Sequence, residues 1–139
     1  MNDPFNLQRF VEAQEPLYER VLAELRAGQK QSHWMWFVFP QIAGLGHSAM
    51  AQKYAIASID EAKAYLAHPL LGPRLRECTQ HVLNIEGKTA VEIFDYPDDL
   101  KFRSSMTLFA HAAPDDPIFR DTIRKYFNGA FDKVTVRAL

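Results

Sequence analysis

Apolar residues recur at intervals of three and four along most of the chain, the spacing that places side chains on one face of a helix. The first such segment covers about residues 5–27 and carries Pro16 near its middle. A proline inside a helix removes a hydrogen bond and clashes with the preceding turn, so we expect a kink or a break there. Gly28 follows the segment directly and is a suitable C-terminal cap.

Capping residues mark where further helices begin. Ser58 with Glu61, and likewise Thr89 with Glu92, have the spacing of a capping box, in which two side chains satisfy each other's backbone amides. Ser48, Asp116 before a proline and Asp132 are further candidate caps. The predicted helices are 48–57, 58–68, 70–85, 89–94, 100–112, 118–128 and a last turn or two within 132–139.

The segment 32–39 has two competing interpretations. It is either a short helix capped by Ser32 or a buried strand, because six consecutive apolar residues do not settle the period. Elsewhere only residues 134–136 hint at the alternation of a strand. No internal repeat or linker interrupts the pattern. The sequence therefore predicts an all-α fold of about six to eight helices in one globular domain, residues 1–139.

Composition narrows the class of protein. Sixteen Lys and Arg residues against seventeen Asp and Glu give a formal net charge of -1, which argues against a nucleic-acid or anionic-membrane binder. No apolar run approaches the roughly 20 residues of a membrane span. Cys78 is the single cysteine, so no intrachain disulfide forms, and the first residues lack the features of a signal peptide. We expect a cytoplasmic protein; the oligomeric state is left open.

Large aromatic and polar residues are concentrated in the segment 32–48, which contains both tryptophans, two of the five histidines and two of the six glycines. Trp34 and Trp36 would point about 200° apart on a helix, so they cannot both face one narrow core stripe. We expect one of them, or His33, to line a surface or cleft, where an indole could stack on a nucleobase or nicotinamide. A segment buried on both sides, with internally bonded indole N–H groups, is the alternative.

Two polar clusters add candidate ligand-binding groups. Gly44 and Gly46 precede Ser48, and free backbone amides at a helix start can hold an anion, although a tight turn explains the glycines equally well. Lys101, Arg103 and the neighbouring hydroxyls at 104, 105 and 107 could bind phosphate or ribose hydroxyls. The preceding aspartates 98 and 99 favour a helix start there.

Metal and thiol chemistry have little support in the sequence. Cys78 and His81 are three residues apart on one predicted helix, but no third ligand is apparent. Cys78 also lies on the inward face of that helix, where burial makes a thiol inert. We predict no metal site and no cofactor.

The motifs resemble a known family. These are FVEAQ at 10–14, HWMWFVFPQ at 33–41, GLG at 44–46, DEA at 60–62, YL at 65–66, GPRL at 72–75, KFRSSMTLF at 101–109 and Asp132. They are similar to the bacterial domain-of-unknown-function family 1810 over nearly the whole chain. The resemblance implies a mainly helical single domain and brings no established activity. Members are sometimes labelled calpastatin, a name that belongs to a disordered repeat protein, whereas this composition is globular.

A weaker likeness is to the NADAR group, which acts on ADP-ribose-linked compounds. The shared order of features is a Gly/Ser entry to a helix, the sequence QKY at 52–54, a helix start DEAK at 60–63, an aromatic helix and a late Asp132. The acidic residue expected within 48–50 is absent.

These observations predict a small-molecule site for a nucleotide or an ADP-ribose-like ligand, between the segment 33–48 and the helix 101–107. Whether it hydrolyses its ligand is left open. The candidate acid–base residues are His33, whose unperturbed pKa is ~6.5, and Asp132. The candidate ligand-binding residues are Trp34, Trp36, Gln41, Gly44, Gly46, Ser48, Lys101, Arg103 and Ser104. The rival hypothesis is a non-catalytic protein-interaction module that uses exposed aromatics.

Overall fold

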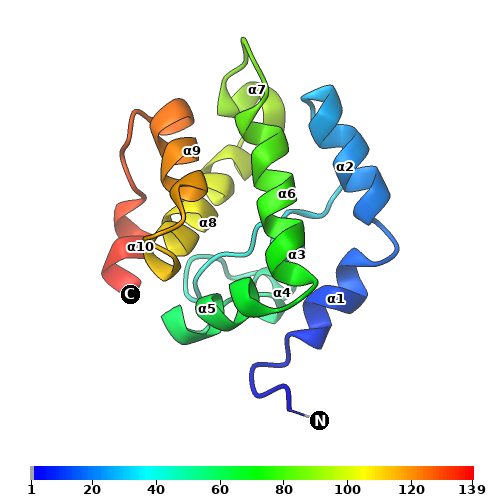
Figure 1. Ribbon diagram of the computed structural model, residues 1–139, viewed down its shortest axis with the longest axis vertical. Helices are drawn as coiled ribbons and strands as arrows, with labels where there is room; N and C mark the ends of the chain where they lie inside the picture. The colour runs from blue at the N-terminus through cyan, green and yellow to red at the C-terminus, as the bar shows by residue number, and fades with distance from the viewer. Residues whose placement is uncertain (1) are drawn as a thin grey trace.

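The computed structural model describes residues 2–139, and over that range the chain is all-α, with ten helices and no strand (Figure 1). The helices are α1 Gln8–Gln14, α2 Tyr18–Ala27, α3 Met35–Val38, α4 Ala49–Lys53, α5 Ile59–Ala67, α6 Leu71–Leu83, α7 Ala90–Phe94, α8 Asp98–Ala112, α9 Pro117–Phe127 and α10 Lys133–Ala138. The fold class is confirmed. The count exceeds the expected six to eight because α3, α4, α7 and α10 are only four to six residues long.

Local signals fixed most helix ends. The predicted break at Pro16 separates α1 from α2, and Gly28 caps α2 in a left-handed conformation with φ 73°. The side chains of Ser48, Ser58, Thr89, Asp116 and Asp132 each accept an amide hydrogen bond at a helix start, as predicted. The capping box at Thr89 is complete, whereas the Glu61 carboxylate accepts from the amide of Ala57 instead of closing the box at Ser58.

The segment 32–39 differs from the prediction in one respect. It contains the short helix α3 and no strand, but Ser32 does not cap that helix. Trp34 occupies the N-cap position, and the Ser32 hydroxyl donates to Glu24 instead. The helix expected over 48–57 also ends early, at Lys53. It ends there because Ile56 turns away to form an isolated parallel bridge with Ile42.

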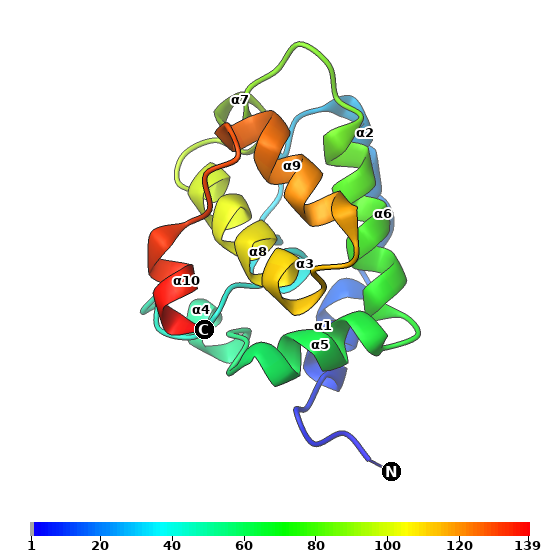
Figure 2. The ribbon, with the colours of Figure 1, turned by 60° about the vertical axis from the view of Figure 1, so that its left-hand side comes forward.

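Helix α8 is the centre of the core. It contacts α3, α5, α7, α9 and α10, and Figure 2 shows it alongside α9 with α10 near by. Phe102, Met106 and Phe109 on α8 are fully buried. The Phe102 ring lies 4.5 Å from that of Phe94 and 4.9 Å from that of Phe39, centroid to centroid, within the range of favourable aromatic pairs. Across residues 2–139, no helix is long and apolar enough to cross a membrane.

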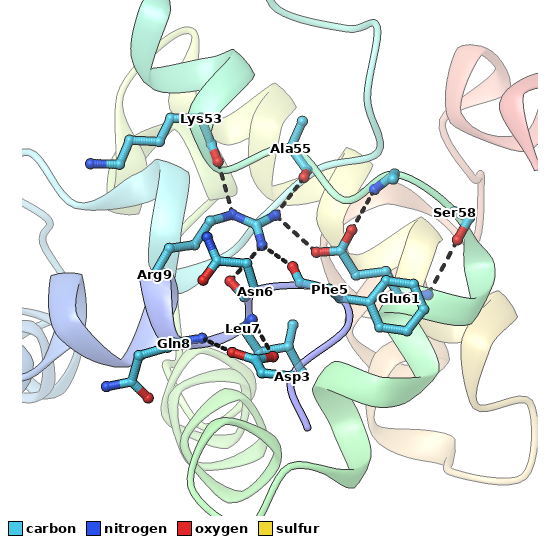
Figure 3. Close-up of polar contacts among 11 residues, drawn as sticks. Asp3, Phe5, Asn6, Leu7, Gln8, Arg9, Lys53, Ala55, Ser58 and Glu61 are labelled. Carbon is cyan, nitrogen blue, oxygen red and sulfur yellow. Dashed lines mark hydrogen bonds and ion pairs between the residues drawn. The ribbon is translucent and has the colours of Figure 1, made fainter. Parts of the chain in front are cut away.

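One buried ion pair joins α1 to α5 (Figure 3). Arg9 donates to the Glu61 carboxylate at 2.8 Å, and these side chains are only 14% and 3% exposed. The same guanidinium donates to the carbonyls of Lys53 and Ala55 and to two carbonyls just before α1. Since Glu61 also accepts from the amide of Ala57, the segment 53–57 is held at several points.

Candidate functional site

The two tryptophans have opposite environments. Trp34 is fully buried, and its indole N–H donates to Glu24 at 2.9 Å. Trp36 is half-buried and lies between two surface hollows, each of which it lines. The sequence predicted that one tryptophan would line a cleft, and that tryptophan is Trp36. Trp34 contributes only to the floor of one hollow.

Glu24 holds Trp34 in the core. Its carboxylate accepts four hydrogen bonds, from the amides of Gln31 and Ser32, the Ser32 hydroxyl and the Trp34 indole. Burial raises the pKa of Glu24, but these four donors outweigh burial and lower its pKa to about 2. The carboxylate is therefore ionised at neutral pH and fixes the chain between α2 and α3.

The larger hollow beside Trp36 has a volume of about 340 Å³, and we call it the charged hollow. Besides Trp36, its walls include Lys30, His33, Asp95, Asp98 and Lys101. The Asp98 carboxylate lies 2.9 Å from the Lys30 ammonium and 3.5 Å from that of Lys101. The ammonium of Lys101 also lies 5.3 Å from the centroid of the Trp36 ring, which is cation–π distance.

The charges in this hollow are unequally compensated. Lys30 is buried, and its ammonium both pairs with Asp98 and donates to the Ser32 carbonyl. Lys101 is held more loosely, by the longer contact to Asp98 and the cation–π contact with Trp36. Among residues 2–139, the side chains of His33 and Asp95 have no hydrogen-bond or ion-pair partner, and both are exposed. Asp95 has φ 63° and ψ 158°, a conformation that glycine normally adopts, so its backbone is strained at the rim.

The second hollow has a volume of about 200 Å³, and we call it the neutral hollow. Its walls come from α3, the loop before α4, α4 itself and the turn after that helix, and include Trp36, Gln41, Gly44, Gly46, Gln52 and Tyr54. Every lining residue that the structure describes is uncharged. The backbone amide of Ala43 donates to Ile56, and that of Ile56 to Gln41, so the two walls are hydrogen-bonded to each other.

A third, shallow hollow of about 270 Å³ borders both of these and is lined by Gln41, Leu45, Pro97, Leu100, Lys101, Ser104, Asp132 and Val134. Ser104 and Asp132 bind each other there: the Ser104 hydroxyl donates to Asp132 and to the Leu100 carbonyl. Asp132 also accepts from the amide and hydroxyl of Thr135, as the cap of α10.

The structure therefore brings together part of the predicted site. His33, Trp36, Gln41, Gly44, Gly46 and Lys101 line the charged and neutral hollows. His33 and Asp132 line different hollows, so they do not form an acid–base pair across one cavity. Ser48 caps α4 and lines none of the three hollows.

Arg103 is committed to the fold. Its guanidinium donates to the carbonyls of Ala130 and Phe131 and lies 5.6 Å from the centroid of the Phe127 ring. These contacts attach the segment before α10 to α8. Arg103 lines none of the three hollows. His33 and Gln41 line hollows on opposite sides of Trp36, so the predicted site residues His33, Gln41, Ser48 and Arg103 do not converge on one cavity.

Cys78 is buried, and burial raises the pKa of its thiol to about 12, so the thiol is protonated at neutral pH. This agrees with the inward position expected from the helical pattern. Within the described part of the chain, no group of three or more His, Cys, Asp or Glu side chains is placed to hold a metal ion.

Sequence reasoning missed the opposite wall of the charged hollow. The sequence indicated only a helix start in this stretch, favoured by the aspartates at 98 and 99, yet Asp95, Tyr96 and Asp98 line the hollow and Tyr96 is 74% exposed. Lys30 was also missed, because nothing near it in the sequence indicates that it pairs with an aspartate 68 positions later. An exposed tyrosine between two acidic residues was the available signal.

Comparison with known proteins gives the family. The chain is similar to the conserved hypothetical protein Rv1873 from Mycobacterium tuberculosis, whose crystal structure matches with a TM-score of 0.98 and 55% sequence identity, covering 99% of this chain and 98% of that one. No curated protein matches. The family model described as "Protein of unknown function (DUF1810)" matches residues 4–139. The chain therefore belongs to the DUF1810 family, as its motifs predicted.

Proposed function

We propose that this protein binds a nucleotide or an ADP-ribose-like small molecule across Trp36. In this proposal the flat ring of the ligand packs against the indole and its anionic group pairs with Lys101. The observation that carries the proposal is the position of Trp36 between the two hollows, with the Lys101 ammonium 5.3 Å from its ring centroid. An aromatic surface next to a cation is the combination that a phosphate-bearing ring requires.

The size and polarity of the site support this proposal. The charged hollow, at about 340 Å³, is within the range of small-molecule pockets, roughly 300–1,000 Å³. Lys101 is the better anion ligand of its two lysines, because Asp98 already pairs more closely with Lys30. Among the described residues that line this hollow, His33 supplies the imidazole, a side chain that can both accept and donate a proton. If hydrolysis occurs, we assign the proton transfer to His33, since Asp132 serves as a helix cap.

The direct test is a thermal-shift and calorimetric titration with ADP-ribose and AMP. ADP-ribose is the first probe because of the sequence likeness to the NADAR group. A ligand at 100 times its Kd stabilises the folded state by about 2.7 kcal/mol, which raises the melting temperature by several degrees in a domain of this size. Trp36→Ala and Lys101→Ala should each weaken binding about tenfold or more.

Lys125→Ala is the matched control. Lys125 lies 5.4 Å from the Tyr126 ring centroid and 3.5 Å from Glu86, and its side chain is 29% exposed, as is that of Lys101. It lies on α9 and lines none of the three hollows, so its loss should leave the Kd unchanged. A wild-type protein that binds neither probe, or equal effects of the two lysine variants, would refute the proposal.

The rival function, a protein-interaction module, has one observation in its favour. Tyr96, Leu100 and Val134 are 74%, 46% and 54% exposed, and the last two line the shallow hollow. A protein partner that is lost on Tyr96→Ala and Leu100→Ala, with no response to either small ligand, would favour this function. A cytoplasmic location suits both functions and remains part of the proposal.

A further inference from the structure

We infer that the neutral hollow is the subsite for the ring of the ligand, and that it selects an uncharged planar ring with a hydrogen-bonding edge, such as a neutral nucleobase. This inference rests on the proposed function, namely a ligand that binds beside Trp36. It adds which of the two hollows receives the ring and what chemistry recognises it.

Volume separates the roles of the two hollows. The neutral hollow, at about 200 Å³, lies below the usual range for a whole small-molecule site. It is therefore suited to one ring and not to an entire nucleotide. The charged hollow, on the other side of Trp36, is larger and carries the lysine that pairs with an anion. A ligand that spans Trp36 can place its ring in one hollow and its phosphate in the other.

Charge separates them further. Every described residue around the neutral hollow is uncharged, whereas two lysines, two aspartates and a histidine line the charged hollow. A charged ring entering the neutral hollow would lose hydration without gaining a counter-charge, which is unfavourable. An uncharged ring would lose little and would gain contact with Trp36 and Tyr54.

The polar groups around the neutral hollow are free and of both kinds. The Gln41 carboxamide has no partner among residues 2–139, and neither do the backbone amides of Gly44 and Gly46. Gln52 donates through Nε2 to the His47 carbonyl, which orients its carboxamide and leaves the oxygen as an acceptor. Uncharged donors and acceptors of this kind match the edge of a nucleobase.

The walls are held in place before any ligand binds. The Ile42–Ile56 bridge joins them, and Arg9 with Glu61 fixes the segment that contains Tyr54 and Ala55 (Figure 3). Gly46 is packed so closely that an added Cβ would lie 2.7 Å from that of Ala51. Gly44, at φ +98°, has open space where a side chain would be, so the mouth stays unobstructed. Such preorganisation reduces the loss of freedom on binding.

The experiment compares three probes by calorimetry: adenosine, AMP and ribose 5-phosphate. On the wild type we expect AMP to bind most tightly and adenosine to bind measurably. We expect Gln41→Leu to weaken adenosine and AMP about tenfold, the effect of one lost hydrogen bond to a ring. Ribose 5-phosphate should be unaffected. Gln41→Glu, nearly the same size, should weaken AMP further because it adds an anion to the neutral hollow.

Gln80→Leu, at an exposed position on α6, is the control and should change none of the affinities. Circular dichroism melts establish that each variant is folded. If AMP binds the wild type but Gln41→Leu has no effect, or if ribose 5-phosphate binds as tightly as AMP, the inference is overturned and the proposed function survives. If the wild type binds neither AMP nor ADP-ribose, the proposed function fails, and the inference fails with it.

Discussion

Trp34 and Trp36 are two positions apart on the same short segment, yet one belongs to the fold and the other borders the candidate site. Trp34 is fully buried and its N–H is bonded to Glu24, while Trp36 is half-buried between two hollows. Around Trp34, the Glu24 carboxylate, the Ser32 hydroxyl and the Lys30 ammonium each have a hydrogen-bond or ion-pair partner. Around Trp36 the groups of Gln41, His33 and Asp95 have no partner in residues 2–139.

The difference shows that two neighbouring residues can have separate roles, one in stabilising the fold and one in lining a candidate binding site. Polar groups that stabilise the native state bind each other and have no capacity left for a ligand. Polar groups that are held in position but left unpaired reduce stability slightly and are available to bind. Substitutions at Trp34 and its partners, and at Trp36 and its neighbours, test this contrast.

The largest effect is expected at Trp34. Trp34→Ala should lower the free energy of unfolding by about 3–5 kcal/mol, because it leaves a large cavity and removes one of the four hydrogen-bond donors to Glu24. Trp36→Ala should lower it by only about 1 kcal/mol, since that side chain is half-buried. Urea denaturation of both variants measures the two values. Similar losses from the two substitutions would contradict the division between fold and site.

The next effect is expected at Arg9, far in sequence from either tryptophan. Arg9→Ala should destabilise the protein by about 2–4 kcal/mol, because it leaves Glu61 buried without its partner and frees the carbonyls of Lys53 and Ala55. The control is Arg124→Ala, which removes an exposed pair with Asp121 and should change stability by less than about 0.5 kcal/mol. Equal losses would show that the wall of the neutral hollow is not held by Arg9.

Glu24, which binds the Trp34 indole, should make the free energy of unfolding depend on pH in a characteristic way. Its folded pKa, about 2, is below the unfolded value of 4.5, so the carboxylate stabilises the fold fully above pH 4.5. This stability is lost as pH falls toward 2. Glu24→Gln should cost about 2 kcal/mol at pH 7, a value reduced for solvent screening, and should flatten the stability profile between pH 5 and 2. An unchanged profile would mean that the carboxylate does not hold Trp34.

The smallest effect is expected at Lys101. Its contacts to Asp98 and Trp36 are partly exposed, so Lys101→Ala should change the unfolding free energy by less than about 0.5 kcal/mol. Urea denaturation at low and moderate salt measures this. A loss above about 1 kcal/mol would make Lys101 a structural residue, like Arg103, and would remove the cation from the proposed site.

The sequence by itself determined the helical fold class, the break at Pro16 and the caps at Ser48, Ser58, Thr89, Asp116 and Asp132. These features depend on interactions within about four residues of one another, and such interactions are readable from spacing. The sequence also located the aromatic segment and Lys101 as a region of interest. It did so because large aromatic and polar residues are concentrated there.

Only the tertiary structure decided which tryptophan borders the two hollows and which polar groups have no hydrogen-bond partner within residues 2–139. Glu24 is ten positions from Trp34, Lys30 is 68 from Asp98, and Arg103 reaches carbonyls 27 and 28 positions away. Arg103 and Lys101 differ in role although they share one helix turn, since the segment before α10 binds Arg103 whereas Lys101 lines the charged hollow. Whether a side chain is paired depends on elements that folding brings beside it, and these elements cannot be identified from the local sequence pattern.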